Sequence, residues 1–564
     1  MSQRWWEEYP ERLEFEIAEL TELGLSPEIN AAEKEAGKLV IHVQHTLNGQ
    51  PINLTIRYPD NYPFFRFELI APDLDLPRHQ NPHEKNLCLI GRATGNWNPD
   101  QDTPARFITD QLPKVLEAAN GNGEGIEETQ GEPVSEYYPH SGRTVLIDSE
   151  WAIDSQQENG FIELRINADM GTARMAAARV LDASGNILTE SSPAIIDLYK
   201  DVITVPWVRL PELYKTQDAK EFRGKLLSAY PHLRNTSWIK DPIEGREYSI
   251  VGVVFPEEMR YRQFQDGWIF LLTYREKTKE GKKKITNHFP FFVHAGRAGL
   301  QDMLERTPNL AFLREKKVAV VGLGSIGAPS VLEFAKNGVG ELHIIDYDFV
   351  EPGTTVRWPL GLSFVVGRKF DALKHFIAQN YPYTRIFVHP MRVGAVDGNP
   401  QNDAIEEIVN HVDLVYDATA ETGVHHYLAH RARSSSTPYI LTSATPGAWG
   451  GVVARFNSGG PCWACFERAR SEGKIPLPPE APDGSVQPVG CGSPTFTGSS
   501  FDLQEVALTG VRLAVATLSP ADKYGNVEWD IANLSLREKD KFLLPEWTPV
   551  TLEKYTDCSC AQET

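Results

Sequence analysis

A glycine-rich turn in the second half of the chain has the residue types and spacing of a phosphate-binding loop. Gly322, Gly324 and Gly327 form a GxGxxG pattern between an apolar run and a stretch with helical character. Such glycines let the backbone approach phosphate closely, and a helix N-terminus adds partial positive charge. Asp346 closes the next apolar run about twenty residues on, the position of an acidic residue that binds ribose hydroxyls. This context predicts a nucleotide site, with a nucleotide-free domain of the same fold as the alternative.

Two cysteines stand in settings that suit nucleophilic chemistry. Cys491 follows a proline-rich stretch without periodicity and precedes a helical stretch that starts near Asp502. A thiolate is a good nucleophile, and an adjacent helix N-terminus would lower the pKa of the thiol. Cys88 lies between two leucines, a few residues after His79 and Asn81. The alternatives are an inert loop cysteine for Cys491 and simple core packing for Cys88.

The other cysteines, Cys462, Cys465, Cys558 and Cys560, form a CxxC pair and a CxC pair. Four thiolates can enclose Zn²⁺ tetrahedrally, and structural zinc sites of this kind hold chain ends to cores. The two pairs predict a structural zinc site, with buried or idle thiols as the alternative. Because six cysteines in 564 residues do not make a disulfide framework, we expect a reducing, cytoplasmic location.

The glycine loop needs a parallel α/β sheet to position it. From about residue 301 to 530, apolar runs alternate with helical stretches, which is the pattern of such a sheet. The strands are expected at residues 317–321, 342–346, 414–417 and 439–442, and a helix at residues 330–336.

The first 118 residues or so predict an α+β unit of another kind. An amphipathic opening precedes period-two alternation at residues 38–43 and 52–57, which is typical of half-buried antiparallel strands. After Cys88 we expect a helix over residues 107–116, in which Pro113 is a weak point.

The region between these two units is dominated by strand-like runs, from about residue 141 to 300. A segment rich in Gly and Glu, from Asn120 to Gly131, predicts a linker before it. The region contains no recognisable catalytic set, so we expect a connector or recognition domain. The predicted domains are therefore residues 1–140, 141–300 and 301–564.

Residues beyond the glycine loop resemble the activating-enzyme superfamily that includes ThiF and MoeB. They are acidic Asp346 and Asp348 at a strand end, then Arg357, and then a Gly-x-Lys sequence in which Lys369 opens the following helix. The resemblance implies ATP as the nucleotide, because Arg357 and Lys369 would stabilise charge on the phosphates while a carboxylate is adenylated. A hydride-transfer enzyme would not need that pair, which leaves an NAD-dependent oxidoreductase as a minor alternative. Cys491 resembles the catalytic cysteine of this superfamily, on a crossover loop near the adenylate.

One position departs from that superfamily. Its Asp-x-x-Asp-Asn sequence, whose second Asp lies near magnesium, is here Asp417-Ala418-Thr419-Ala420-Glu421. Ala420 takes the place of the second acidic residue. The Mg²⁺ ligand is therefore Asp417, or Glu421 after a shift of one residue.

The N-terminal segment resembles the active site of ubiquitin-conjugating enzymes. Tyr58 to Pro63, His79-x-Asn81, Cys88 between leucines, and Trp97 follow in the order of that family. The resemblance implies a thioester on Cys88, with Asn81 supporting the oxyanion when an amine attacks. Because Gln80 replaces the usual proline, His83 is a second candidate for that support.

Together the two regions resemble bacterial fusions of a conjugating domain to an activating domain, which are known from CBASS anti-phage operons. The resemblance implies a homodimer that adenylates a protein C-terminus and carries it as a thioester on Cys491 and then Cys88. The acyl group then passes to a target amine. The implied donor is a cGAS-like nucleotide synthase, with a bacterial ubiquitin-like protein as the alternative. An activator of a sulfur-carrier protein and a non-catalytic scaffold remain competing functions, and Ala420 favours the scaffold.

Charge and hydropathy exclude other classes of function. The formal net charge of -20 argues against sequence-independent nucleic-acid binding, which needs a basic face. The basic stretch at residues 277–284 is interpreted as a hairpin tip. No apolar run is long enough for a membrane span, and the first residues lack an apolar signal segment, so we expect neither a membrane partner nor secretion.

Overall fold

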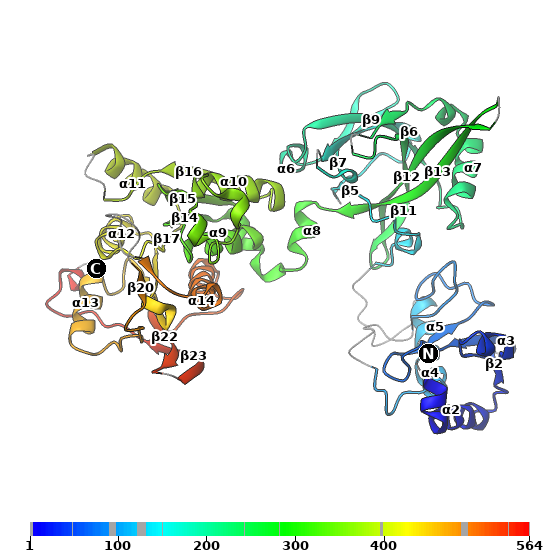
Figure 1. Ribbon diagram of the computed structural model, residues 1–564, viewed down its shortest axis with the longest axis horizontal. Helices are drawn as coiled ribbons and strands as arrows, with labels where there is room; N and C mark the ends of the chain where they lie inside the picture. The colour runs from blue at the N-terminus through cyan, green and yellow to red at the C-terminus, as the bar shows by residue number, and fades with distance from the viewer. Residues whose placement is uncertain are drawn as a thin grey trace. The chain divides into compact units, whose positions relative to one another are not determined.

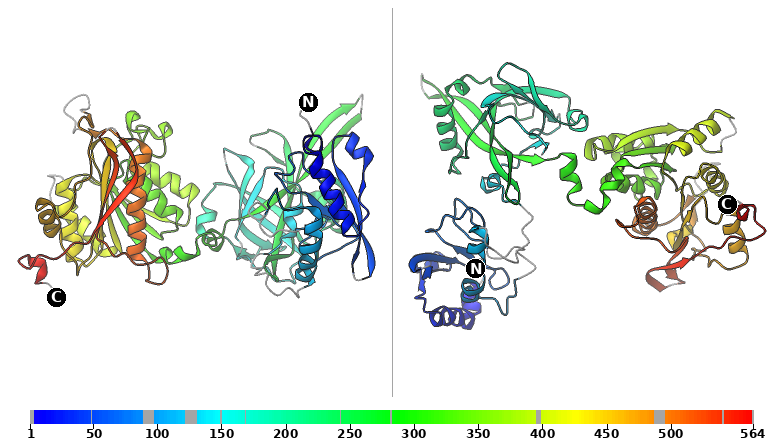
Figure 2. Two further views of the ribbon diagram at one scale, coloured as in Figure 1. Left: turned by 90° about the horizontal axis from the view of Figure 1, so that it is seen from below. Right: turned by 180° about the vertical axis from the view of Figure 1, so that it is seen from behind.

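A computed structural model describes residues 4–47, 49–88, 97–120, 131–148, 150–167, 169–241, 243–280, 283–394, 399–486, 495–539 and 541–562. The chain divides into two compact units (Figures 1 and 2). The first comprises Met1–Ser191 and Tyr199–Arg297, and the second comprises Ser192–Leu198 and Ala298–Thr564. The predicted subdivision of the first 300 residues into two domains stays a prediction, although two separate sheets occur there.

The N-terminal part of the first unit is a four-stranded antiparallel sheet with helices. Its elements are α1 (Trp5–Glu8), α2 (Pro10–Glu22), β1 (Glu28–Ile29), α3 (Ala31–Glu35), β2 (Val40–Leu47), β3 (Gln50–Arg57), β4 (Glu68–Ile70), α4 (Pro104–Asp110) and α5 (Leu112–Asn120). Alternate residues of the paired strands β2 and β3, such as Ile41 and Leu54, are buried in one core. The two predicted strands are thereby confirmed.

The helix predicted over residues 107–116 is interrupted. α4 ends at Asp110 and α5 begins at Leu112, with Gln111 between them. Pro113 has no backbone N–H to donate, and its ring excludes the preceding turn of a continuous helix. The weak point expected at Pro113 is therefore a real break, two residues before the proline.

The second part of the first unit is a nine-stranded sheet. Its elements are η1 (Val134–Tyr137), β5 (Thr144–Ile147), β6 (Asn159–Asn167), β7 (Gly171–Asp182), β8 (Ile187–Glu190), β9 (Asp201–Arg209), α7 (Ala219–Ala229), η2 (Pro231–Asn235), β10 (Ile239–Lys240), β11 (Glu247–Arg260), β12 (Gln263–Glu280) and β13 (Lys283–Arg297). The strand-rich prediction for this region is confirmed, and the basic stretch lies where β12 and β13 pair as a hairpin.

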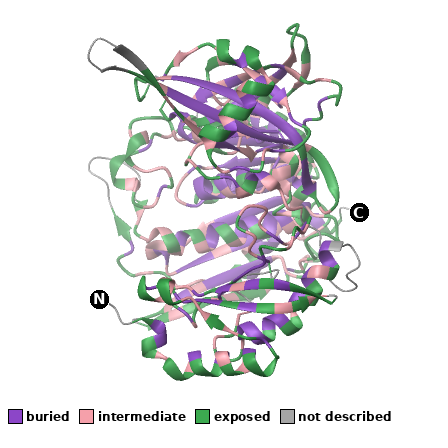
Figure 3. Ribbon diagram, turned by 90° about the vertical axis from the view of Figure 1, so that its right-hand side faces the viewer, coloured by how far each residue is buried: buried purple, intermediate pink, exposed green. Residues whose placement is uncertain are grey.

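The nine-stranded sheet closes on itself. β9 pairs with β6 along one edge and with β11 along the other, so the strands β11, β12, β13, β5, β7, β6 and β9 form a ring, which we call the barrel. Long stretches of the barrel strands are buried (Figure 3). Large buried side chains, among them those of Trp207 and Trp268, belong to the barrel core. The barrel therefore has a packed core and no edge strand within that ring.

The second unit is an eight-stranded sheet in the order β16-β15-β14-β17-β18-β19-β22-β23. Its strands are β14 (Lys317–Val321), β15 (Glu341–Asp346), β16 (Arg385–Pro390), β17 (Leu414–Asp417), β18 (Tyr439–Ala444), β19 (Gly450–Phe456), β22 (Ile531–Glu538) and β23 (Lys541–Val550). A short separate hairpin consists of β20 (Ser485–Val486) and β21 (Thr495–Phe496). Its helices are α6 (Pro193–Ile196), α8 (Leu300–Leu304), η3 (Pro308–Glu315), α9 (Gly327–Lys336), η4 (Pro352–Thr354), η5 (Leu362–Phe364), α10 (Lys369–Asn380), α11 (Asn399–His411), α12 (Thr422–Ser434), η6 (Pro446–Ala448), α13 (Trp463–Ser471), α14 (Ser500–Leu518) and η7 (Ser559–Ala561).

Helices cover both faces of this sheet. Val318 and Val320 of β14 pack with α9, α10 and α14, whereas Ala319 and Val321 pack with α11, α12 and α13. β14 to β18 run parallel, which confirms the predicted parallel α/β arrangement and all four of its predicted strands. The strand order reverses at β14, and ligands of such sheets bind beyond the carboxyl ends of the strands at that point.

Within the part of the chain that the structure describes, none of the helices combines the length and the hydropathy of a membrane span.

Candidate functional sites

The glycine loop joins the end of β14 to the start of α9, as the sequence predicted. Gly322 has a φ of +83°, and a Cβ there would lie 2.9 Å from the carbonyl oxygen of Ala418. A Cβ on Gly327 would lie 1.8 Å from the carbonyl oxygen of Gly322, so α9 begins directly against the loop. A Cβ on Gly324 would meet no atom within 4 Å. The fold thus requires two of these glycines, whereas Gly324 borders open space.

Asp346 at the end of β15 ties the loop to the neighbouring strand. Its Oδ2 accepts a hydrogen bond of 2.6 Å from the amide of Leu323, and its Oδ1 accepts one of 2.7 Å from the amide of Asp348. The indole Nε1 of Trp358 donates to the carbonyl oxygen of Leu323 at 3.0 Å. Buried Asp346 therefore fixes the loop backbone, and its predicted contact with ribose stays a prediction.

Lys369 begins α10 and lies beside the end of β15. Its Nζ is 2.9 Å from Oδ2 of Asp348, and its amide donates to the carbonyl oxygen of Asp348 at 3.1 Å. The Lys369 side chain is 12% exposed and that of Asp348 is 50% exposed. The fold thus brings together the predicted cation and a carboxylate that a metal ion could still reach.

Arg357 lies against the chain that follows Cys491. Its Nη1 donates to the carbonyl oxygen of Phe496 at 2.5 Å and its Nη2 donates to Oγ1 of Thr495 at 3.0 Å. Burial lowers the pKa of Arg357. Cys491 itself lies outside the described residues, in the connection between the paired strands β20 and β21. The geometry therefore links Arg357 to β21, which follows Cys491 in the sequence, and its contact with phosphate stays a prediction.

Asp417 is fully buried at the end of β17. Its Oδ1 accepts hydrogen bonds from the amide and the hydroxyl of Thr419 at 2.9 and 2.8 Å. Its Oδ2 lies 2.9 Å from Nδ1 of His425 and accepts a hydrogen bond of 2.7 Å from the hydroxyl of Tyr439. Four contacts occupy the carboxylate, so this arrangement does not suit the magnesium role expected of Asp417. Glu421, whose side chain is 53% exposed, is accessible instead.

Cys88 is exposed and lies next to the turn that contains His79 and Asn81. The amide of Cys88 donates to the carbonyl oxygen of His79 at 2.8 Å. Oδ1 of Asn81 accepts hydrogen bonds from the amides of His83 and Glu84 at 2.9 and 3.1 Å, which shapes the turn. The side-chain nitrogen Nδ2 of Asn81 is therefore the group suited to donate a hydrogen bond to an oxyanion, a role that stays a prediction.

The surroundings of Cys88 include an acidic residue that sequence reasoning missed. Glu132 accepts a hydrogen bond of 2.8 Å from the amide of His79 through Oε2, and its Oε1 is 3.0 Å from Nδ1 of His79. Although Cys88 is exposed, protein atoms around the sulfur partly desolvate it; this desolvation and, secondly, the negative charge of Glu132 raise the pKa of the thiol, whereas Arg66 opposes this shift. Glu132 lies far along the chain beyond the expected linker, and its local sequence carries no signal for this position.

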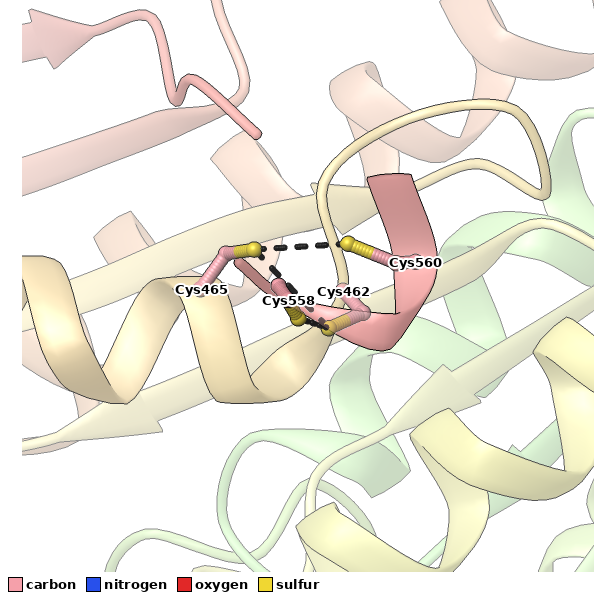
Figure 4. A group of neighbouring side chains, drawn as sticks. All are labelled: Cys462, Cys465, Cys558 and Cys560. Carbon is pink, nitrogen blue, oxygen red and sulfur yellow. Dashed lines mark hydrogen bonds between the residues drawn. The ribbon is translucent and has the colours of Figure 1, made fainter. Parts of the chain in front are cut away.

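The four remaining cysteines meet at one place in the second unit (Figure 4). Cys462 and Cys465 lie at the start of α13, and Cys558 and Cys560 lie near the end of the chain. The Sγ atoms are 3.5 Å apart for Cys462 and Cys558, 3.4 Å for Cys465 and Cys560, and 3.9 Å for Cys462 and Cys465. The predicted grouping of these thiols is thus confirmed.

Comparison with known sequences identifies relatives of the whole chain and of its C-terminal region. The profile of the ThiF family matches residues 299–497. The proteins y4oA and y4qC of Sinorhizobium fredii are each 33% identical to this chain. The match to y4oA covers 99% of this chain and 97% of y4oA, and that to y4qC covers 96% of both. The adenylyltransferase and sulfurtransferase UBA4 of Scheffersomyces stipitis is 27% identical over 36% of this chain and 41% of UBA4.

Two solved structures show weaker similarity. E. coli MccB crystallised with ATP is 15% identical, with a TM-score of 0.34, over 45% of this chain and 68% of MccB. The crystal structure of PaaA is 20% identical, with a TM-score of 0.33, over 43% of this chain and 67% of PaaA. The sequence comparisons confirm the expected ThiF-type adenylation domain, whereas the conjugating-enzyme-like N-terminal domain stays a prediction.

We predict that substitution by alanine affects ATP binding at one position of the glycine loop and stability at another. Gly324→Ala leaves the melting temperature unchanged but weakens ATP binding about tenfold or more, because its Cβ enters only the open space beside the loop. Gly327→Ala lowers the melting temperature, because its Cβ would collide with the carbonyl oxygen of Gly322. Thermal unfolding and calorimetric titration with ATP measure both effects, and equal ATP affinity in Gly324→Ala would contradict the prediction.

We also predict that Glu132 contributes to the ionisation behaviour of Cys88. Desolvation and, secondly, the charge of Glu132 raise the pKa of the thiol, so Glu132→Gln removes the second contribution and lowers the pH at which alkylation by iodoacetamide is half-maximal. The rate is measured on the Cys88 peptide by mass spectrometry across a pH series. Exposed Glu136 of the same segment provides the control Glu136→Gln, which keeps the wild-type midpoint. A midpoint that Glu132→Gln leaves unchanged would refute this electrostatic role.

Proposed function

The chain belongs to the family that includes y4oA and y4qC of Sinorhizobium fredii, and its C-terminal region is a ThiF-family adenylyltransferase domain; from this we propose a two-stage acyl transfer. In the first stage the protein uses ATP to adenylate the C-terminal carboxylate of a donor protein. In the second stage the acyl group moves to Cys491, then to Cys88, and finally to an amine of a target. The observation that carries this proposal is the glycine loop, held by Asp346 beside the Lys369–Asp348 pair.

The residues at the carboxyl edge of the sheet suit the adenylation stage. ATP supplies the phosphoanhydride bond whose cleavage activates the carboxylate. The backbone around Gly324 lies open to phosphate oxygens, and Lys369 provides a cation at the same edge. The half-exposed carboxylate of Asp348 is suited to Mg²⁺, with Glu421 as a second candidate in place of the saturated Asp417.

The residues around the crossover segment and the exposed thiol support the transfer stage. Arg357 contacts Thr495 and Phe496, a few residues after Cys491, so a cation lies next to the chain that carries this thiol. Cys88 is exposed, which a thiol that exchanges acyl groups with another protein segment must be. Asn81 and His83 are the candidates for supporting the oxyanion. The two thiols lie in different units, and the proposed transfer takes place within one chain or across a homodimer.

The donor is a protein with a free C-terminal carboxylate, for which we propose a cGAS-like nucleotide synthase of an anti-phage CBASS system. A second candidate function is activation of a ubiquitin-like or sulfur-carrier protein. The similarity to UBA4, an adenylyltransferase and sulfurtransferase, favours this second function. The exposed thiol of Cys88, which lies outside the ThiF match, favours conjugation. Both functions require ATP, and we propose a cytoplasmic location for either.

The four clustered cysteines fit a zinc ion. Tetrahedral zinc with thiolate bonds of about 2.3 Å places its sulfur ligands roughly 3.8 Å apart. The three sulfur–sulfur distances between 3.4 and 3.9 Å agree with this spacing. We propose that Cys462, Cys465, Cys558 and Cys560 bind a structural Zn²⁺, which joins the C-terminal segment to α13.

We predict that the acyl relay depends on Lys369 and on both reactive cysteines. The protein is incubated with ATP, Mg²⁺ and a candidate donor encoded beside it, and reducible adducts are separated on non-reducing gels. Lys369→Ala lowers the rate of adduct formation roughly a hundredfold, because it removes the cation beside the phosphates. Cys491→Ala abolishes adducts on both cysteines, and Cys88→Ala abolishes only the second one.

Lys374→Ala serves as the matched control, since Lys374 is an exposed lysine on the same helix. It keeps the wild-type rate. A full rate in Lys369→Ala, or an adduct on Cys88 in the absence of Cys491, would contradict the proposed sequence of steps.

For the cysteine cluster we predict one zinc per chain by elemental analysis. Cys465→Ser and Cys560→Ser lose the metal, and the melting temperature falls by several degrees because the C-terminal segment is released from α13. Cys88→Ser retains full zinc content and serves as the control. If the wild-type protein contains no zinc and the two cysteine variants keep its melting temperature, these thiols are only packed together.

A further inference from the structure

The segment of residues 131–138, between the N-terminal sheet and the barrel, is fixed to β11. A Cβ on Gly131 would lie 2.5 Å from the carbonyl oxygen of Glu258, so the backbone of this glycine packs directly against the backbone of β11. The amide of Ser135 donates to Oε1 of Glu257 at 2.8 Å, and the amide of Glu132 donates to Oε2 of Glu258 at 3.3 Å. Two adjacent carboxylates of β11 therefore hold the segment by its backbone.

Further contacts hold the other end of the segment to the barrel region. The hydroxyl of Tyr138 donates to the carbonyl oxygen of Tyr214 at 2.6 Å. The side-chain amide of Gln217 donates to the carbonyl oxygen of Tyr137 at 2.7 Å. The barrel thus determines where the side chains of the segment project.

The same segment contacts the turn that carries Cys88. Both carboxylate oxygens of Glu132 contact His79, through its backbone amide and its Nδ1, and the carbonyl oxygen of His79 accepts the amide hydrogen of Cys88. A buried ion pair between Arg78 and Glu258 joins this turn to β11 as well. Glu132 is therefore held between the barrel and the turn that leads to Cys88, where its charge acts on the thiol.

The surroundings of Glu132 and Cys88 favour an ionised carboxylate near a neutral thiol. Burial favours the neutral form of Glu132, but hydrogen bonds from His79 and the charges of His79 and Arg78 outweigh it and lower the pKa of the carboxyl. The carboxylate is therefore ionised at neutral pH, and its side chain remains 22% exposed. Tyr137 has its pKa raised to about 12 by burial and by the nearby Cys88 and Glu132, so its hydroxyl stays protonated.

An acyl group on Cys88 would meet its acceptor at this place. The side chain of lysine arrives as an ammonium ion, which is strongly hydrated and is attracted to a carboxylate of low pKa. We propose that Glu132 is a specificity-determining residue of the thiol site, whose carboxylate binds the target ammonium beside the acyl group on Cys88. This inference rests on the proposed function, in which Cys88 carries a thioester. It gives the barrel region a role in choosing the acceptor.

In the transfer step the bound ammonium first releases one proton to water and becomes the free amine. Its nitrogen attacks the thioester carbonyl, the carbon–nitrogen bond forms, and the carbon–sulfur bond breaks. The departing sulfur of Cys88 takes a second proton from the nitrogen, which leaves an amide and a neutral thiol. A carboxylate beside the thiol favours that neutral product over the thiolate.

The test uses full-length protein with Cys491→Ala, so that Cys88 is the reactive thiol under study. A glycylglycine thioester of mercaptoethanesulfonate acylates Cys88 by exchange, which mass spectrometry of the Cys88 peptide verifies. Free lysine is then added near neutral pH, and loss of the acyl group is timed. Hydroxylamine, which is uncharged at that pH, serves as the comparison nucleophile because it gains nothing from a negative charge.

Glu132→Gln removes the charge but keeps an oxygen that can accept the amide hydrogen of His79. It slows transfer to lysine roughly tenfold and changes transfer to hydroxylamine by less than about twofold. Glu136→Gln, in the same segment, leaves both rates unchanged. Equal lysine rates in Glu132→Gln and wild type would overturn the inference. An equal loss with both nucleophiles would also overturn it, since that result indicates a structural role.

A second variant, Gly131→Val, tests whether the barrel places Glu132. Its side chain would collide with the backbone of β11 and shift the segment, so it slows transfer to lysine while transfer to hydroxylamine persists. An unchanged lysine rate in this variant would overturn the role of the barrel. If Cys88 reacts with iodoacetamide but never accepts the glycylglycine group, the proposed thioester function itself fails. That outcome is distinct from a failure of the role of Glu132.

Discussion

The hydrogen bond between the amide of Leu323 and the carboxylate of Asp346 is the contact on which the nucleotide edge depends. It joins the loop after β14 to the end of β15. The same carboxylate accepts the amide of Asp348, whose side chain pairs with Lys369 at the start of α10. One buried acidic side chain thereby aligns the glycine loop, a carboxylate and a cation along the carboxyl edge of the sheet.

The thiol region depends on a different constraint, because its parts come from distant places in the sequence. The turn around Cys88 contributes the exposed thiol, and the segment anchored on β11 contributes Glu132. Desolvation and, secondly, the charge of Glu132 raise the pKa of the thiol, so less of it is ionised at neutral pH than in an ordinary cysteine. The negative charge of Glu132 also attracts cations, which supports the proposal that the acceptor is an amine.

Sequence patterns were sufficient wherever the determining interactions are local. β14 and β17 have the predicted bounds, because each strand is a short apolar run in a sheet buried on both faces. The cysteine cluster was predicted from spacing, since metal-binding thiols recur at short fixed intervals.

Where long-range contacts determine the position or the environment of a side chain, sequence patterns were insufficient. Asp417 has the position expected of a metal ligand, yet Thr419, His425 and Tyr439 occupy its carboxylate. Glu132 has no local signal, because only the packing of its segment on β11 brings it to Cys88.

Pyrophosphate exchange is the most direct test of the proposal that the glycine loop activates a protein C-terminus with ATP. Labelled pyrophosphate is incubated with the protein, ATP, Mg²⁺ and the candidate donor, and its incorporation into ATP is measured. We predict exchange that requires the intact donor and disappears when the last residue of the donor is removed. Exchange that is equally fast with the truncated donor, or with no donor at all, would contradict activation of a protein C-terminus.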